Sequence, residues 1–136
     1  MAFRELSEQD THSPYHFLDL KEFDMGEMST KREYLVGYLG RLEVEKGVLN
    51  FAMSLPELMK YFDIERFLIC GNGSLSENVT DIFRENDLGN RIIMPGWIGH
   101  DDLPRYLKEI RLTVLPSYTE GLPNIMLEAM ASGSII

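Results

Sequence analysis

From residue 34 onward, short apolar runs alternate with stretches of helical periodicity. The runs span residues 34–39, 66–70, 91–94, 111–115 and 134–136. Continuous apolar runs of this length favour strands that are buried on both faces of a sheet. The fifth run reaches the last residue of the chain soon after it begins, so we expect it to be the start of a further strand.

Between these runs, apolar residues recur every three or four positions, which predicts helices. In the first such stretch, Val48, Phe51 and Leu55 follow helical spacing. Pro56 lies inside this stretch, and a proline in a helix interior removes a backbone donor and clashes with the preceding turn. We therefore expect Pro56 to kink or split the first helix.

Three more helices are expected along the chain. Ser74 and Glu77 have the spacing of a capping box, which predicts a helix start at Ser74. The others are expected over 103–110 and 123–132, with Gly133 just past the last helical residue. This order predicts an α/β fold, namely a Rossmann-like parallel sheet with helices on both faces.

The chain divides near residue 33. Residues 1–33 show no sustained periodicity, and we expect an irregular connector there. Residues 34–136 are expected to form a partial Rossmann-like domain. In such sheets ligands bind at the carboxyl ends of the strands, so candidate chemistry should lie in the loops that follow them.

Composition narrows the possible functions. The chain has 136 residues, is 44% hydrophobic and carries 22 acidic against 13 basic residues, for a net charge of −9. This balance argues against nucleic acid as a partner. One cysteine, Cys70, and three histidines exclude a disulfide framework and do not predict a metal site. No apolar run is long enough for a membrane span, and the polar start is no signal peptide, so the cytoplasm is the expected location.

The loop after the first run places two cations between glycines. Arg41 and Lys46 lie five residues apart between Gly40 and Gly47. Arginine offers a planar fork for phosphate oxygens, lysine offers a point charge, and glycine lets the backbone approach a ligand. The loop therefore fits a diphosphate. Alternatively, it is a surface loop whose cations pair with the neighbouring glutamates.

The loop after the fourth run carries two carboxylates eight residues apart. Glu120 precedes the helix expected over 123–132, and Glu128 lies in its second turn. The amino end of a helix favours an anion, and carboxylates accept hydrogen bonds from sugar hydroxyls. Alternatively, Glu120 caps the helix and Glu128 lies on a solvated or ion-paired face.

The remaining loops are less specific. The Gly71-Asn72-Gly73 turn is typical of nucleotide-binding loops but lacks the third glycine of the dinucleotide fingerprint; alternatively, it is only a tight strand-to-helix turn. In the third loop Trp97 and Ile98 offer a stacking face and an apolar wall for a base; alternatively, Trp97 packs in the core or at the rim. His100 suits a general base or a helix start. Cys70, at the end of a buried run, is expected to be a core residue.

Taken together, the loops resemble one protein family. The stretches VGYLGRLEVEKGV, FLICGNGSLSENV, NRIIMPGWIGHDDLPRYL and LTVLPSYTEGLPNIMLEAMASG occur in family order. They are similar to the carboxyl-terminal, donor-binding domain of retaining glycosyltransferases of family 4, the group 1 glycosyl transferases. Family members are two-domain enzymes of the B-type fold that use nucleotide-diphosphate sugars.

The resemblance implies a binding site for the donor diphosphate. Arg41 and Lys46 match the family's diphosphate-binding pair. The backbone amides around Gly121, Leu122 and Asn124 match the turn that contacts sugar and phosphate.

The same resemblance assigns the sugar, ribose and base contacts. Glu120 matches the glutamate that meets the sugar hydroxyls, Glu128 the one that binds the ribose, and Ile98 a position near the base. Arg41, Lys46 and Glu120 would thus carry catalysis. The family needs no metal or cofactor, and the nucleotide sugar is its donor substrate.

Complete family members also have an amino-terminal Rossmann-like domain that binds the acceptor. The resemblance therefore implies that the chain is one donor-binding half, truncated at both ends, that works with an acceptor-binding domain or subunit. Membrane contact would be indirect, through a lipid-linked acceptor. Two alternatives stay open, namely a non-catalytic nucleotide-sugar-binding module and an inactive remnant of a split gene.

Overall fold

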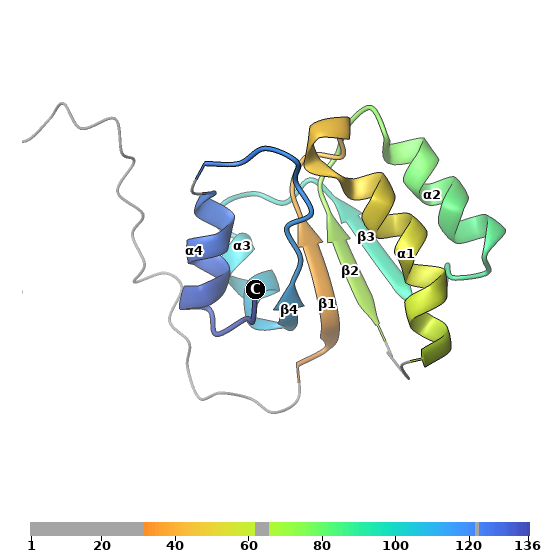
Figure 1. Ribbon diagram of the computed structural model, residues 1–136. Coiled ribbons are helices and arrows are strands. Elements are labelled where there is room, and N and C mark those ends of the chain that lie inside the picture. Colours follow the sequence, from red (N-terminus) through yellow and green to blue (C-terminus); the bar gives the residue numbers. More distant parts are fainter. Residues whose placement is uncertain (1–31, 62–65, 122) are drawn as a thin grey trace, which may run out of the picture.

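The predicted α/β fold with a parallel sheet is confirmed. The computed structural model describes residues 32–61, 66–121 and 123–136 (Figure 1). Its elements, in chain order, are β1 (Tyr34–Leu39), the 3-10 helix η2 (Val44–Lys46), α1 (Val48–Tyr61), β2 (Phe67–Cys70), α2 (Ser76–Glu85), β3 (Ile92–Gly96), α3 (Leu103–Lys108), β4 (Ile110–Thr113) and α4 (Asn124–Ala131). The four strands pair in parallel in the order β3-β2-β1-β4.

Helices cover both faces of the sheet. Helices α1 and α2 lie on one face, and α3 and α4 lie on the other (Figure 1). Alternate residues of β2 divide between the two resulting cores: Phe67 and Ile69 belong to the core under α1 and α2, whereas Leu68 and Cys70 belong to the core under α3 and α4. Because all four are buried, the apolar run of β2 is nearly continuous, as expected for a strand covered on both sides.

The structure shows neither a split of the first helix nor a capping box at Ser74. Helix α1 continues through Pro56 from Val48 to Tyr61 and is not split, because its buried stripe packs on the sheet across the proline. Helix α2 begins at Ser76 without a side-chain cap, so no capping box forms. The hydroxyl of Ser74 instead donates to Glu43, 31 residues away, and a tertiary hydrogen bond replaces the local one.

The last helix begins one position later than expected and ends as predicted. Pro123 is the residue before the first helical position of α4 rather than the first helical residue. At the other end, Gly133 has a left-handed φ of 75°. The Ser134 N–H donates to the Ala129 carbonyl at 2.9 Å, which satisfies an orphan carbonyl at the helix end.

The final apolar run, expected to start a further strand, pairs with β4 through one isolated bridge. Ile135 forms a parallel bridge with Leu112 of β4. Its N–H donates to the Arg111 carbonyl at 2.9 Å, and its carbonyl accepts from the Thr113 N–H at 2.7 Å. The edge of the sheet at β4 is therefore paired over these residues.

Of the connector expected over 1–33, only Arg32 and Glu33 lie within the described residues. The guanidinium of Arg32 donates to three carbonyls. The acceptors, with their distances, are Leu107 at 3.2 Å, Ile110 at 2.7 Å and Ser132 at 2.9 Å. Arg32 thus joins the carboxyl-terminal ends of α3 and α4 to the start of β4. None of the described helices combines the length and the apolar character that crossing a bilayer requires.

Candidate functional site

The loops after the strands meet in a cleft of about 400 Å³ at the carboxyl edge of the sheet. Five side chains predicted for the site line this cleft: Arg41, Lys46, Ile98, Glu120 and Glu128. Topology explains the convergence, because all four parallel strands end at this edge and each sends its loop there.

Two further predicted site residues, Gly121 and Asn124, are not among the residues that line the cleft. Gly121 is exposed beside it, and Asn124 is the exposed first residue of α4. Leu122 lies outside the described residues. Pro123 and Ile125 do line the cleft, so the amino end of α4 faces it.

Glycine and a buried tyrosine shape the loop after β1. The Tyr38 hydroxyl donates to the Arg41 carbonyl at 2.7 Å and fixes the start of the loop. The chain then forms the short 3-10 helix η2, which the sequence analysis did not predict, and leaves it at Gly47 with a left-handed φ of 65°. This path directs Lys46 into the cleft.

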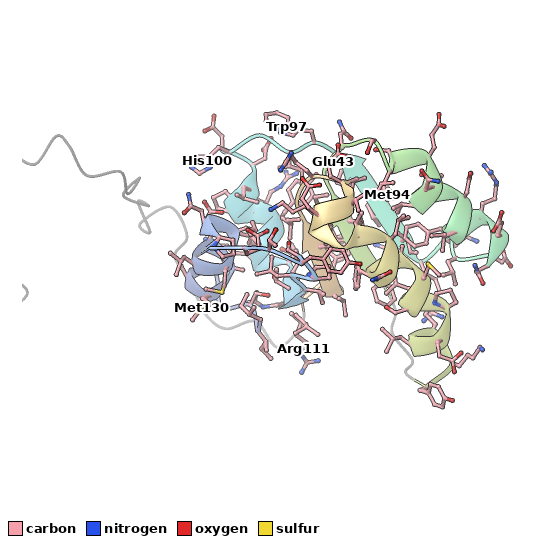
Figure 2. All side chains as sticks on the ribbon, turned by 45° about the horizontal axis from the view of Figure 1, so that its top comes forward. Glu43, Met94, Trp97, His100, Arg111 and Met130 are labelled. Atoms are coloured by element: carbon pink, nitrogen blue, oxygen red, sulfur yellow. The ribbon has the colours of Figure 1, made fainter. Side chains whose placement is uncertain are left out.

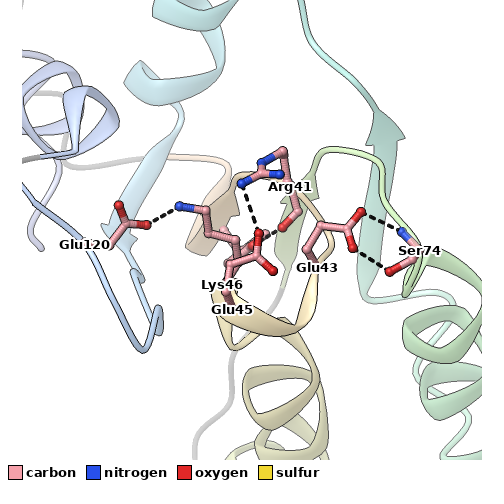
Figure 3. A network of polar contacts seen from close by, with 7 residues as sticks. Arg41, Glu43, Glu45, Lys46, Ser74 and Glu120 are labelled. Carbon is pink, nitrogen blue, oxygen red and sulfur yellow. Dashed lines mark hydrogen bonds and ion pairs between the residues drawn. The ribbon is translucent and has the colours of Figure 1, made fainter.

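Both cations of the loop pair with carboxylates (Figure 3). The Arg41 guanidinium lies 3.0 Å from a Glu45 carboxylate oxygen, so the alternative of a local ion pair holds for this residue. Lys46 pairs with Glu120, 74 residues away, and not with its neighbours. The Lys46 and Glu120 side chains are 22% and 26% exposed, against 67% and 47% for Arg41 and Glu45, so the second pair is much better sheltered from solvent.

The loop that carries Glu120 is held against the Lys46 loop by further contacts. The Tyr118 N–H donates to the Glu45 carbonyl at 3.0 Å. The Tyr118 hydroxyl accepts from the Asn50 side-chain amide at 2.6 Å. The hydrogen bonds from Lys46 and then Ser117 lower the pKa of Glu120, so it is a carboxylate at neutral pH. Helix α4 has no side-chain cap, so the alternative that Glu120 caps it is wrong.

Glu128 is a buried carboxyl group on the wall of the cleft. It is only 5% exposed, which rules out the alternative of a solvated helix face. Burial raises its pKa, and the charge of His100 acts in the opposite direction. A carboxylate in this position benefits from any ligand that brings hydroxyl donors.

The third loop forms the rim of the cleft. Trp97 is 72% exposed, so it is not a core residue, and it lines the cleft together with Ile98 and His100. Figure 2 shows Trp97 and His100 at the same end of the molecule as Glu43. Cys70 also lines the cleft but is buried, and burial raises the pKa of its thiol to about 12, as expected for an inert core cysteine.

A brace between the first two loops was not predicted. Glu43 accepts hydrogen bonds from the Ser74 N–H at 2.9 Å and from the Ser74 hydroxyl at 2.5 Å (Figure 3). Tyr38 and Ser117 were missed as well. Glu43 and Ser74 come from different segments, Tyr38 bonds to a backbone carbonyl, and Ser117 bonds to Glu120 within its own loop, so none of these contacts has a recognisable sequence pattern. Within the described part of the chain, no three side chains of His, Cys, Asp or Glu gather as a metal site would require.

Comparison with known proteins identifies the family. A family profile described as "Glycosyl transferases group 1" matches residues 33–136. The chain belongs to this family. It is 33% identical over 118 residues to the Escherichia coli UDP-Gal:alpha-D-GlcNAc-diphosphoundecaprenol alpha-1,3-galactosyltransferase, a match that covers 85% of this chain and 30% of the relative.

Solved structures agree with this assignment at the level of the fold. The carboxyl-terminal domain of the group 1 glycosyl transferase LpcC from Francisella tularensis superposes with a TM-score of 0.75 at 21% identity, covering 87% of this chain and 68% of that one. The pneumococcal O-GlcNAc transferase GtfA, solved with UDP and GlcNAc, gives 0.72 at 20% identity, covering 82% of this chain and 22% of that one. The chain spans about a quarter to a third of the length of the curated relatives it matches.

Proposed function

We propose that this chain supplies the donor-binding half of a retaining glycosyltransferase that uses a nucleotide-diphosphate sugar. The observation that carries the proposal is the convergence of Arg41, Lys46, Glu120 and Glu128 on one cleft at the carboxyl edge of the sheet. Two cations suit a diphosphate, and two carboxylates suit hydroxyl groups. Two related proteins named above, a UDP-galactose transferase and a transferase solved with UDP, support this choice of ligand.

In the proposed reaction, the sugar is transferred with retention at the front face of the donor. The bond between the sugar C1 and the diphosphate oxygen breaks, and the diphosphate keeps the electron pair. The acceptor oxygen bonds to C1 from the same face, and its proton passes to the departing phosphate. Arg41, Lys46 and the amino end of α4 stabilise the charge that develops on the leaving group. Glu120 orients the sugar, Glu128 binds the ribose, and the loop at Ile98 meets the base.

The acceptor would be bound by a second Rossmann-like domain or subunit. The E. coli relative's name gives a lipid diphosphate as its acceptor, which supports a lipid-linked acceptor and only indirect membrane contact here. A single buried thiol fits a protein of the reducing cytoplasm.

The binding step can be tested with the full chain. Trp97 is the only tryptophan and lines the cleft, so its fluorescence can report on ligands. UDP, GDP, ADP and their glucose derivatives would be titrated alongside the parent nucleosides. Lys46→Ala should weaken binding of the preferred nucleoside diphosphate by about tenfold or more, because a charge-assisted contact to phosphate is lost, and should leave nucleoside binding nearly unchanged.

Lys60→Ala is the matched control, because Lys60 pairs with Glu57 at 2.7 Å on α1 and does not line the cleft. This variant should bind as the parent chain does. An equal loss for nucleoside and nucleoside diphosphate in Lys46→Ala would refute the diphosphate assignment. No binding of any nucleotide would refute the donor site, and binding without turnover after addition of an acceptor-binding half would favour a non-catalytic module.

A further inference from the structure

Glu120 pairs with one of the two cations that the proposed donor site assigns to the diphosphate. The ammonium group of Lys46 pairs with this carboxylate; the two side chains are 22% and 26% exposed, and Glu120 lies in an exposed stretch of its loop (Figure 3). Partial shelter from solvent strengthens the attraction relative to a surface pair. Any anion that binds Lys46 must therefore compete with an internal carboxylate.

The loop that carries Glu120 is anchored close to Lys46 at Tyr118. The Tyr118 N–H bonds to the Glu45 carbonyl, next to Lys46 in the chain, at 3.0 Å. Asn50 of α1 holds the Tyr118 hydroxyl at 2.6 Å. A diphosphate that displaces Glu120 from Lys46 thus arrives beside a nearby negative charge.

This charge acts differently on the two nucleotides that a transferase cleft meets. The terminal phosphate of a bare nucleoside diphosphate ionises a second time with a pKa of about 6, so it is close to doubly charged at neutral pH. The same phosphate in a nucleotide sugar is esterified and carries a single charge. It also brings sugar hydroxyls, which can donate hydrogen bonds to the Glu120 carboxylate. These hydrogen bonds replace the one that Glu120 loses when Lys46 turns to the phosphate.

We propose that Glu120 is a specificity-determining residue that makes the cleft favour the sugar-bearing diphosphate over the bare nucleoside diphosphate. This inference rests on the proposed donor site and adds to it a preference for the nucleotide sugar over the bare nucleoside diphosphate. The residue that would contact the sugar also penalises the product, so bare diphosphate is held less firmly than two cations alone would hold it.

The test compares dissociation constants for UDP and UDP-glucose, or for the guanosine or adenosine pair if that base binds better. Glu120→Gln keeps the shape of the side chain and removes its charge. It should tighten binding of the bare diphosphate by about threefold or more and leave the sugar diphosphate unchanged or weaker. The gain should shrink in high salt, because screening weakens the repulsion.

Glu57→Gln is the matched control. It removes a carboxylate from another Lys–Glu pair, on α1 and away from the cleft, and should leave the ratio of the two constants unchanged. Circular dichroism would confirm that each variant is folded.

Weaker binding of the bare diphosphate by Glu120→Gln, or an equal change for both ligands, would overturn the inference while leaving the donor site intact. If the parent chain binds neither ligand, the proposed function and the inference both fail.

Discussion

Gly47 lies directly against the backbone of Pro116. A Cβ atom on Gly47 would fall 2.1 Å from the Pro116 carbonyl oxygen, and Gly47 has a left-handed φ of 65°. The contact joins the end of the loop that carries Lys46 to the start of the loop that carries Glu120. A side chain at this position would thus force apart two loops that the cleft requires to be close together.

Gly47→Ala should therefore destabilise the protein by about 2 kcal/mol or more, because both steric overlap and backbone strain oppose it. Nucleotide affinity should fall as well. Gly89→Ala is the control, because a Cβ at Gly89 meets nothing within 4 Å and its φ is not positive. That variant should stay within about 0.5 kcal/mol of the parent. Urea unfolding measures both, and equal stability of the two variants would contradict the steric argument.

The brace between Glu43 and Ser74 should help to hold the Arg41 loop in place. Glu43→Ala should weaken diphosphate binding by about threefold, and Glu43→Gln should restore part of it, because an amide still accepts the Ser74 N–H. In a double-mutant cycle, Ser74→Ala should add little to Glu43→Ala. Full additivity would show that the two residues act independently.

The pH range over which the Glu43–Ser74 hydrogen bonds stabilise the loop depends on the pKa of Glu43. The two hydrogen bonds from Ser74 lower this pKa. The stabilisation is present at neutral pH, and it is lost as the pH falls through the lowered pKa. A loss of diphosphate affinity between pH 8 and pH 6 in the parent chain but not in Glu43→Gln would contradict this assignment.

Glu128 should be a destabilising residue that is kept for the site. Its pKa is raised above the ordinary 4.5 by burial, so the charged form disfavours the folded state at neutral pH, and protonation on acidification relieves the cost. Glu128→Gln should raise the melting temperature by about 3 °C at pH 8. The difference should shrink as the pH falls towards the raised pKa. A constant difference across this range would show that the carboxylate charge is not the cause.

Arg32 should contribute more to stability than an exposed arginine does. Arg32→Ala removes hydrogen bonds to three carbonyls from α3, β4 and the end of α4, and should cost about 2–3 kcal/mol. Arg32→Lys should recover only part of this, because an ammonium group lacks the planar fork. Arg66→Ala, which breaks an exposed pair with Glu33, should cost less than about 1 kcal/mol. Chemical denaturation of the three variants separates these outcomes.

The strands and helices were predictable because their signals are local. Strand β2 appears as an unbroken apolar run because both of its faces are covered, and Gly133 marks the end of α4 because a left-handed residue is needed there. Pro56 does not split α1, because the proline's effect is local and the packing of α1 on the sheet outweighs it.

The sequence predicted that certain side chains would share one edge of the sheet, but not which of them would contact one another. Parallel topology alone brings Lys46, Glu120 and Glu128 to one edge of the sheet. Which cation meets which carboxylate depends on how far each loop reaches. Arg41 pairs with Glu45, a neighbour in its own loop, whereas Lys46 pairs with Glu120, which is 74 residues away in the chain. The brace from Glu43 to Ser74 is beyond sequence reasoning for the same reason.

The place of β1 in the sheet has a consequence for folding. Strand β1 is paired on one side with β2 and on the other with β4, the last of the four strands in the chain. In the folded protein, the pairing of β4 with β1 brings Lys46 and Glu120 together. Closing the stretch of chain between β1 and β4 is slow compared with forming a local helix. Ligand affinity should therefore appear late in refolding, as the last signal to recover, and a ligand that spans both loops should stabilise the whole sheet against unfolding rather than one corner of it.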